Sequence, residues 1–179
     1  TVVKGGTLEV TDRVADGVVE SVGTLGLGTV RLEETQLRFA LNSGESRLVV
    51  SNDIRGVADA LKSGAGTVEL SGSVQLSAAL EGGTSTARFE VAGGELVLAA
   101  VGRPALEQLN KLEISGGLVK IRGDEQISES AAVTISSGGL MFDPSVSGRV
   151  ERILSLRNEG GTLSTGANML RGIGSTMEW

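Results

Sequence analysis

The chain contains no cysteine and no histidine among its 179 residues. Without cysteine there is neither a disulfide framework nor a thiolate metal site. The double absence also excludes Ser-His-Asp and Cys-His nucleophiles and every metal site built on His or Cys. P-loop and dinucleotide fingerprints are missing too, because the glycines lie between predicted strands rather than before a helix. We therefore expect no catalytic site, no tightly bound metal and no organic cofactor.

Aromatic residues make up only 2% of the chain, with no tyrosine and one tryptophan, and proline occurs twice. Glycine occurs 27 times, so the turns are expected to be glycine turns. Hydrophobic residues reach 40% and are mostly valine, leucine, isoleucine and alanine, which suits half-buried strands. These proportions predict a thin aliphatic core in a narrow tube rather than a large two-sheet sandwich.

The formal net charge is −6. This balance argues against nucleic acid as a partner, because a nucleic-acid binder needs a basic face to displace counterions. The longest apolar run, Leu96 to Val101, falls well short of the roughly 18 residues that suggest a membrane helix. No signal segment with a charged and then an apolar part begins at Thr1. We expect a protein that is not membrane-embedded, either cytosolic or the mature part of an exported protein.

Alternating apolar and polar residues predict short strands, most clearly from Lys62 to Ala100. Side chains alternate between the two faces of a strand, so each run has one buried face. The same alternation returns in the last third of the chain. The residues expected to point into one common core are Val68, Leu70, Phe89, Val91, Leu96, Leu98, Ile114, Val133, Ile135 and Leu154.

Glycines that follow these strands recur at a nearly fixed spacing. Gly72, Gly94, Gly117, Gly139 and Gly161 lie 22 or 23 residues apart. A fixed period of about 20–50 residues is the signature of a solenoid or array, because each unit buries its apolar face only by stacking on its neighbours. The sequence therefore predicts an all-β parallel β-helix with about 22 residues per turn and roughly eight turns. We expect one domain over residues 1–179, a segment of a longer repeat protein.

Four stretches depart from the repeat. Asp12 to Ser21 is predicted to be a polar connection, and Thr29 to Leu41 to form two strands that meet in its middle. Asp53 to Ser63 is predicted to be a loop with at most one helical turn. Gly102 to Lys111 is predicted to be a small helix or a folded insertion, since Pro104 suits a first helical position.

Neighbouring carboxylates occur at Glu33-Glu34 and at Asp124-Glu125. Adjacent residues of a strand point to opposite faces, so both pairs are expected to be solvated turn residues rather than catalytic ones. Asp124, Glu125 and Asp143 could hold a hard cation through oxygen atoms. Their spacing matches no calcium-loop pattern, which favours ordinary charged turns. Among the aromatic residues, Phe39, Phe89 and Phe142 are expected in the core, and only Trp179 at the surface.

The run from Gly64 to Gly72 (GAGTVELSG), followed by Glu90 to Leu98 (EVAGGELVL), resembles the autotransporter-associated β-strand repeat. The block from Asp124 to Leu140 is similar to a segment common in long surface proteins of this kind. The resemblance covers Lys62 to Leu163 and is weaker before Lys62. It implies a right-handed parallel β-helix exported to the bacterial cell surface, and it specifies architecture far better than activity.

Three classes of function stay open at this point. The first is a non-enzymatic structural or adhesive module of an exported cell-surface solenoid, which contacts surface ligands and associates end to end with copies of itself or with neighbouring solenoid segments as a filament. The second is a polysaccharide-active enzyme on the same fold, which the scarcity of aromatic platforms disfavours. The third is a cytosolic scaffold that polymerises. We favour the first, with an extracellular location.

Overall fold

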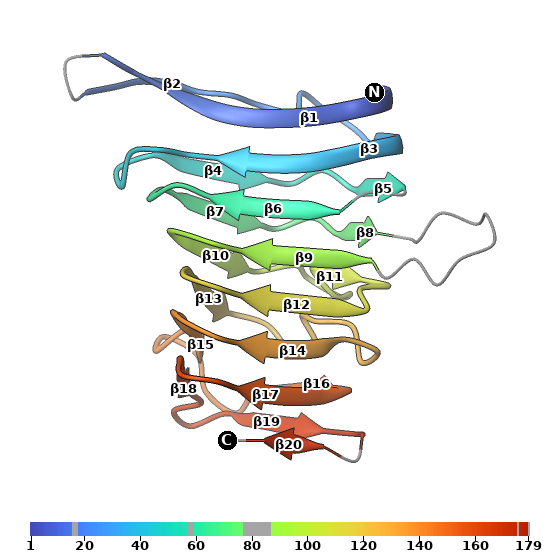
Figure 1. The fold of residues 1–179 in the computed structure, drawn as a ribbon, viewed down its shortest axis with the longest axis vertical. Helices are drawn as coiled ribbons and strands as arrows, with labels where there is room; N and C mark the ends of the chain where they lie inside the picture. The colour runs from blue at the N-terminus through green and yellow to red at the C-terminus, as the bar shows by residue number, and fades with distance from the viewer. Residues whose placement is uncertain (16–17, 57–58, 77–86, 175, 179) are drawn as a thin grey trace.

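The computed structural model describes residues 1–15, 18–56, 59–76, 87–174 and 176–178. Every regular element in these ranges is a β-strand, and the strands stack along one axis from the N-terminal to the C-terminal coil (Figure 1). The chain is a β-solenoid of about 6 turns with about 23 residues per turn. The predicted fold class is confirmed and the predicted period is close. The predicted eight turns are too many, and some offsets between paired residues exceed the glycine spacing, such as 29 residues from Val2 to Arg31 and from Ala60 to Phe89.

One side of the coil is a parallel sheet of six strands in the order β18-β15-β13-β10-β7-β4. We call it the six-stranded sheet. Each coil contributes one short strand to it, and the strands pair in register across the stack. Its strands are β4 (Arg47–Val50), β7 (Thr67–Leu70), β10 (Glu95–Leu98), β13 (Leu118–Ile121), β15 (Gly139–Phe142) and β18 (Thr162–Ser164).

A sheet of twelve strands forms most of the remaining wall, as two rows that both start at β3 (Val30–Ala40). The first row pairs with the beginning of β3 and the second with its end. The first row contains β5 (Ile54–Gly56), β8 (Val74–Leu76) and β11 (Leu106–Glu107); the second contains β6 (Ala60–Ser63), β9 (Arg88–Val91), β12 (Lys111–Ile114), β14 (Ala132–Ile135), β17 (Ser155–Asn158) and β20 (Met177–Glu178). A separate parallel pair, β16 (Val150–Ile153) and β19 (Met169–Gly172), lies near the C-terminal end.

The N-terminal coil differs from the prediction. β1 (Val2–Ala15) pairs in parallel with β3 and then forms an antiparallel hairpin with β2 (Val18–Val22). The stretch Asp12 to Ser21, predicted to be a polar connection, is therefore largely strand. The stretch Thr29 to Leu41 is one strand rather than two. It pairs in parallel with β1 from Arg31 to Ala40, and near its centre the Thr35 hydroxyl lies within hydrogen-bond distance of the carbonyl oxygens of Val3 and Glu33, at 3.1 and 2.9 Å.

Two further expectations are corrected in the middle of the chain. Asp53 to Ser63 contains strands β5 and β6 instead of a loop with a helical turn. Gly102 to Lys111 contains β11, which extends the first row, and no helix. Ala105, Leu106 and Leu109 of this stretch are at most 1% exposed. Their aliphatic spacing suggested a helix, but they fill inward positions of the coil.

The core is one continuous column of aliphatic side chains through the stack. All the predicted inward residues are at most 1% exposed except Leu154, which is 42% exposed. That prediction is wrong because β16 ends at Ile153 and β17 begins at Ser155, which places Leu154 at the corner between two strands. Phe39, Phe89 and Phe142 are buried as predicted.

The glycine frame is real, but two of its members are out of register. Strand pairing aligns Thr67 with Glu95 and Glu95 with Leu118, so the glycine equivalent to Gly94 is Gly66 and not Gly72. The same comparison replaces Gly139 by Gly138. At Gly94 φ is +62°, and an added Cβ would lie only 2.3 Å from the carbonyl oxygen of Gly66. Stacked corners approach this closely only without side chains.

Candidate functional site

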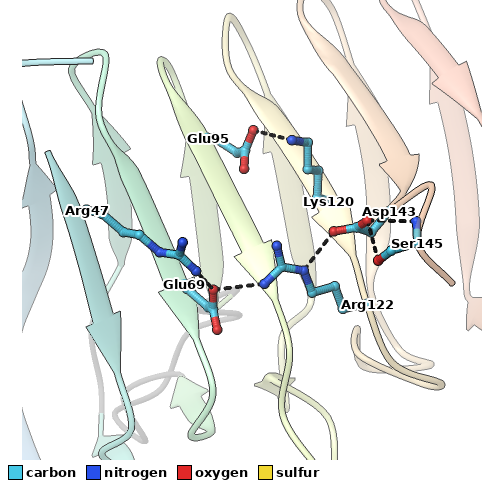
Figure 2. A network of polar contacts seen from close by, with 7 residues as sticks. All are labelled: Arg47, Glu69, Glu95, Lys120, Arg122, Asp143 and Ser145. Atoms are coloured by element: carbon cyan, nitrogen blue, oxygen red, sulfur yellow. Dashed lines mark hydrogen bonds and ion pairs between the residues drawn. The ribbon is translucent and has the colours of Figure 1, made fainter. Parts of the chain in front are cut away.

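The outer face of the six-stranded sheet carries a network of charged side chains from five successive coils (Figure 2). We call it the outer charge network: Arg47, Glu69, Glu95, Lys120, Arg122 and Asp143. Glu69 of β7 accepts from Arg47 of β4 at 2.5 Å and from Arg122 at 2.9 Å. Arg122 follows β13, so its side chain reaches across β10 to β7. The network therefore links coils that are not neighbours.

Arg122 joins this cluster to the next coil through Asp143. Its Nε donates to Asp143 at 2.7 Å, and the Ser145 amide and hydroxyl donate to the same carboxylate at 2.9 and 2.7 Å. The Arg122 guanidinium and these Ser145 donors hold the pKa of Asp143 well below its ordinary value. Lys120 pairs with Glu95 at 2.6 Å on the same face. Each charge of the network thus has an opposite partner.

Val97 shows how closely these side chains cover the sheet. It lies on the outer face, in register with Glu69 on one side and Lys120 on the other. Nevertheless it is only 1% exposed, against 52% for Val49 on the outer face of β4. The bridge from Arg122 to Glu69 spans the strand that carries Val97. On this face Val97 is therefore buried beneath paired charged side chains.

A pocket with a volume of about 550 Å³ lies beside this network. It is an open hollow between the corner at 99–104 and the corner at 122–125, and Arg103, Arg122 and Arg149 reach its edge. Each of these arginines already binds a carboxylate: Arg103 pairs with Asp53, Arg122 with Asp143, and Arg149 with Asp124. The pocket offers no charge that lacks a partner.

The acidic residues singled out in the sequence do not come together. Asp124 accepts from Arg149 and from the Val150 amide, at 2.9 and 2.8 Å. Glu125 binds Arg152, whereas Asp143 binds Arg122. Within the described ranges no three acidic, histidine or cysteine side chains are grouped so that they could hold a metal ion. The three carboxylates therefore act as separate links between coils.

The other predicted pair is only partly described. Glu33 forms an ion pair with Lys4 of the neighbouring strand at 3.2 Å, with both side chains at least half exposed. Glu33 is solvated, as the sequence favoured, but it lies within β3 rather than in a turn. The Glu34 side chain and Trp179 lie outside the described part of the chain.

Lys62 is a fully buried charged residue that the sequence analysis did not predict. It occupies an inward position of the second row, in register with Phe39 before it and Val91 after it, and it is 0% exposed. Its ammonium donates to the carbonyl oxygens of Ser63, Gly64 and Gly93, at 2.9, 3.0 and 3.0 Å. Burial lowers the pKa of Lys62 to about 8, although the negative charge of Asp12 opposes this shift.

Asp12 forms the second buried polar cluster, at the corner formed by residues 42–46. Its carboxylate accepts from the backbone amides of Asn42 and Ser43, both at 2.9 Å, and from the Ser46 hydroxyl. Burial by itself would raise the pKa of Asp12, but hydrogen bonds from Asn42, Ser46 and Ser43 lower it to about 2. Lys62 and Asp12 thus satisfy backbone groups that the strand ladders leave unpaired at corners.

Comparison with known proteins gives no relative: no family model, no curated protein and no solved structure matches this chain. The described residues also contain no helix long and apolar enough to cross a membrane. The described surface thus carries ion-paired charged side chains and, at the C-terminal end of the coil, apolar side chains that are only partly buried.

Proposed function

We propose that this chain is a non-enzymatic structural segment of a β-solenoid that is extended by stacking further coils on its C-terminal face. The proposal rests on how deeply the core-facing side chains of the last coil are buried. Leu163, Leu170 and Met177 pack against the core but are only partly buried. The equivalent positions one coil earlier, Leu140 and Leu156, are 1% exposed.

A further coil would bury these three side chains and pair the free edges of β18 and β20. In a solenoid each coil gains most of its stability from its neighbours, so an uncovered apolar end favours stacking. The added coil comes from the same polypeptide or from a second copy with the same strand spacing. Contacts between the two different ends of copies lead to an open filament rather than a closed ring.

The lateral surface supports a structural rather than a chemical role. The outer charge network and the arginines at the pocket edge are neutralised by carboxylates of other coils. Such ladders keep the walls polar and discourage sideways association of strands. An extracellular location on a bacterial surface, with adhesion to surface ligands, is proposed on the resemblance of the glycine-strand runs to the passenger repeat.

Stacking is tested by light scattering and electron microscopy of the purified chain over a range of concentrations. We expect rods that lengthen at constant width, and Leu163→Asp, at the C-terminal face, should keep the protein monomeric while its β circular-dichroism spectrum is retained. Leu154→Asp is the matched control, since Leu154 is exposed on the lateral surface. A wild-type chain that remains monomeric at the highest concentration would contradict stacking between copies and leave the same polypeptide as the only source of a further coil.

The proposed location is tested separately. An antibody against the chain should label intact cells of the native source, and external protease should remove the labelling. A signal found only in the cytosolic fraction would favour the polymerising cytosolic scaffold instead. Release of sugars from a polysaccharide by the purified chain would contradict the non-enzymatic role.

A further inference from the structure

The first row of the twelve-stranded sheet does not continue into β16 of the next coil. Ile127 is the last residue of that row, bridged to Leu106, and β16 belongs to a different sheet. The amides of Gln126 and Ile127 do not donate to backbone carbonyls of β16. Both donate to the carboxylate of Glu151, at 2.7 and 2.8 Å. We call the contact between residues 124–127 and residues 149–152 the seam.

Other bonds across the seam also depend on carboxylates. Asp124 accepts from the Val150 amide at 2.8 Å, and Glu125 accepts from the Arg152 amide at 3.3 Å. One described backbone pair crosses here, from the Glu125 amide to the Val150 carbonyl at 3.1 Å. On the neighbouring wall, by contrast, β14 and β17 pair over four aligned residues. The C-terminal coils β16 to β20 are therefore joined at the seam mainly through side chains.

Glu151 is the buried member of this group. Its side chain is 0% exposed, and the described residues provide no ion pair for it. The charged groups near it are Asp124 and Glu125 on the preceding coil and Arg149 and Arg152 on its own segment. Arg152 in turn binds Glu129 and is aligned with Arg171 of β19. Arg149 is paired with Asp124, and Arg152 with Glu125 and Glu129. An ionised Glu151 would thus add a negative charge beside two others.

Protonation of Glu151 removes this negative charge, but the carboxyl group still accepts hydrogen bonds from the two amides. A protonated carboxyl still accepts through its carbonyl oxygen and through a lone pair of its hydroxyl oxygen. Burial raises the pKa of Glu151 to about 8 against the lowering effect of the two amide donors, and Glu125 and Asp124 make smaller contributions in the same direction as burial. The protonation state therefore changes within the range in which proteins are handled and function.

We propose that the seam is a proton-operated joint: protonated Glu151 keeps the C-terminal coils docked on residues 124–127, and loss of this proton loosens them while the preceding coils stay folded. The device is local because the neighbouring wall, where β14 pairs with β17, contains four aligned residue pairs and no buried carboxylate. This inference goes beyond the proposed structural role and does not depend on filament formation.

Amide hydrogen exchange measured between about pH 6 and about pH 9, and expressed as protection factors corrected for intrinsic exchange, tests the joint. We expect protection at residues 126, 127 and 150–153 to fall about tenfold or more over this range, as one pKa unit corresponds to a tenfold change. Protection of β10 should stay constant. In Glu151→Gln the pH dependence at the seam should disappear.

Two variants complete the test. Glu45→Gln removes the same charge from an exposed corner and should leave the wild-type pH profile unchanged. Glu125→Gln keeps Glu151 but removes a negative charge that raises its pKa, so the fall in protection should end at a lower pH than in the wild type. A flat profile in the wild type, an equal fall in β10, or a fall that persists in Glu151→Gln would overturn the proposal.

Discussion

Lys62 and Glu151 are two buried ionisable side chains in the same aliphatic core, and their surroundings differ in sign. Lys62 donates to three carbonyl oxygens at a corner, whereas Glu151 accepts from two amides at a seam. Each side chain therefore provides a hydrogen-bond partner for backbone groups that have none in the strand pairing. Asp12 supplies a favourable opposite charge near Lys62, but Asp124 and Glu125 place unfavourable like charges near Glu151.

The difference shows that burial alone does not decide how such a group behaves. Desolvation disfavours the charged form of both residues. Near Lys62 the partner charge opposes that effect, and at Glu151 the neighbours add to it. We therefore expect ionisation to affect stability with opposite signs at the Lys62 corner and at the Glu151 seam.

The largest effect is expected when a carboxylate enters the core without donors. Leu98→Asp places an unpaired charge among aliphatic side chains at a position that is 0% exposed. It should cost about 4 kcal/mol or more of unfolding free energy, measured by urea denaturation. Val49→Asp, on the outer face of the same sheet, should cost far less. Equal costs would show that the inward assignment of Leu98 is wrong.

The sequence predicted the regular part of the molecule because its strands repeat one simple rule. Alternation fixed the inward side of β7, β9 and β10, and the glycine period revealed the coil. The rule fails where polar residues occupy inward positions. In Ala60-Leu61-Lys62 hydropathy favours Leu61 as the inward residue, yet Ala60 and Lys62 point inward.

Glu151 was hidden for a related reason. In Val150-Glu151-Arg152-Ile153 the two aliphatic residues lie on opposite faces of a strand, so alternation cannot select one of them. The structure selects Ile153, which brings Glu151 inward with it. Which amides lack a backbone partner depends on how two distant coils meet, and no local pattern contains that information. The outer charge network was missed likewise, since Arg122 and Glu69 meet only in the stack.

A second substitution tests the geometry of the Lys62 corner. Gly94→Ala would bring a Cβ within 2.5 Å of the Gly64 carbonyl oxygen and 2.7 Å of the Lys62 ammonium, at a φ of +62°. We expect a loss of about 2–4 kcal/mol. Gly102→Ala is the matched control, because Gly102 has a φ of +77° but open space around it. If both variants lose the same stability, backbone strain rather than crowding of the clamp explains the effect.

The third prediction uses pH to separate the two groups. Glu151 has a folded-state pKa of about 8 against an ordinary 4.5, so the folded chain binds more protons in this window and its stability falls as pH rises. Lys62 has a folded-state pKa of about 8 against 10.5, so the folded chain binds fewer protons above pH 8 and its stability rises. The unfolding free energy should therefore pass through a minimum near pH 8.

Two variants test which residue produces the falling part and which the rising part of this pH–stability curve. Glu151→Gln should flatten the falling limb below the minimum, and Lys62→Met should flatten the rising limb above it. Each variant leaves the other limb in place. A monotonic wild-type curve, or loss of both limbs in one variant, would contradict the assignment of the two groups.

The smallest effect is expected on the outer face, where charges are paired in the presence of water. Glu69→Gln removes the carboxylate that joins Arg47 and Arg122, whose side chains are 58% and 37% exposed. Partly exposed ion pairs contribute little, so the loss should be about 0.5–1 kcal/mol. It should shrink further in about 1 M salt, where the Debye length is about 3 Å. Glu45→Gln, at an exposed corner, serves as the control in the same urea titrations. A loss above that of the Gly94 variant, or one that salt leaves unchanged, would mean that the outer charge network is a buried determinant of the fold in the way that Lys62 and Glu151 are.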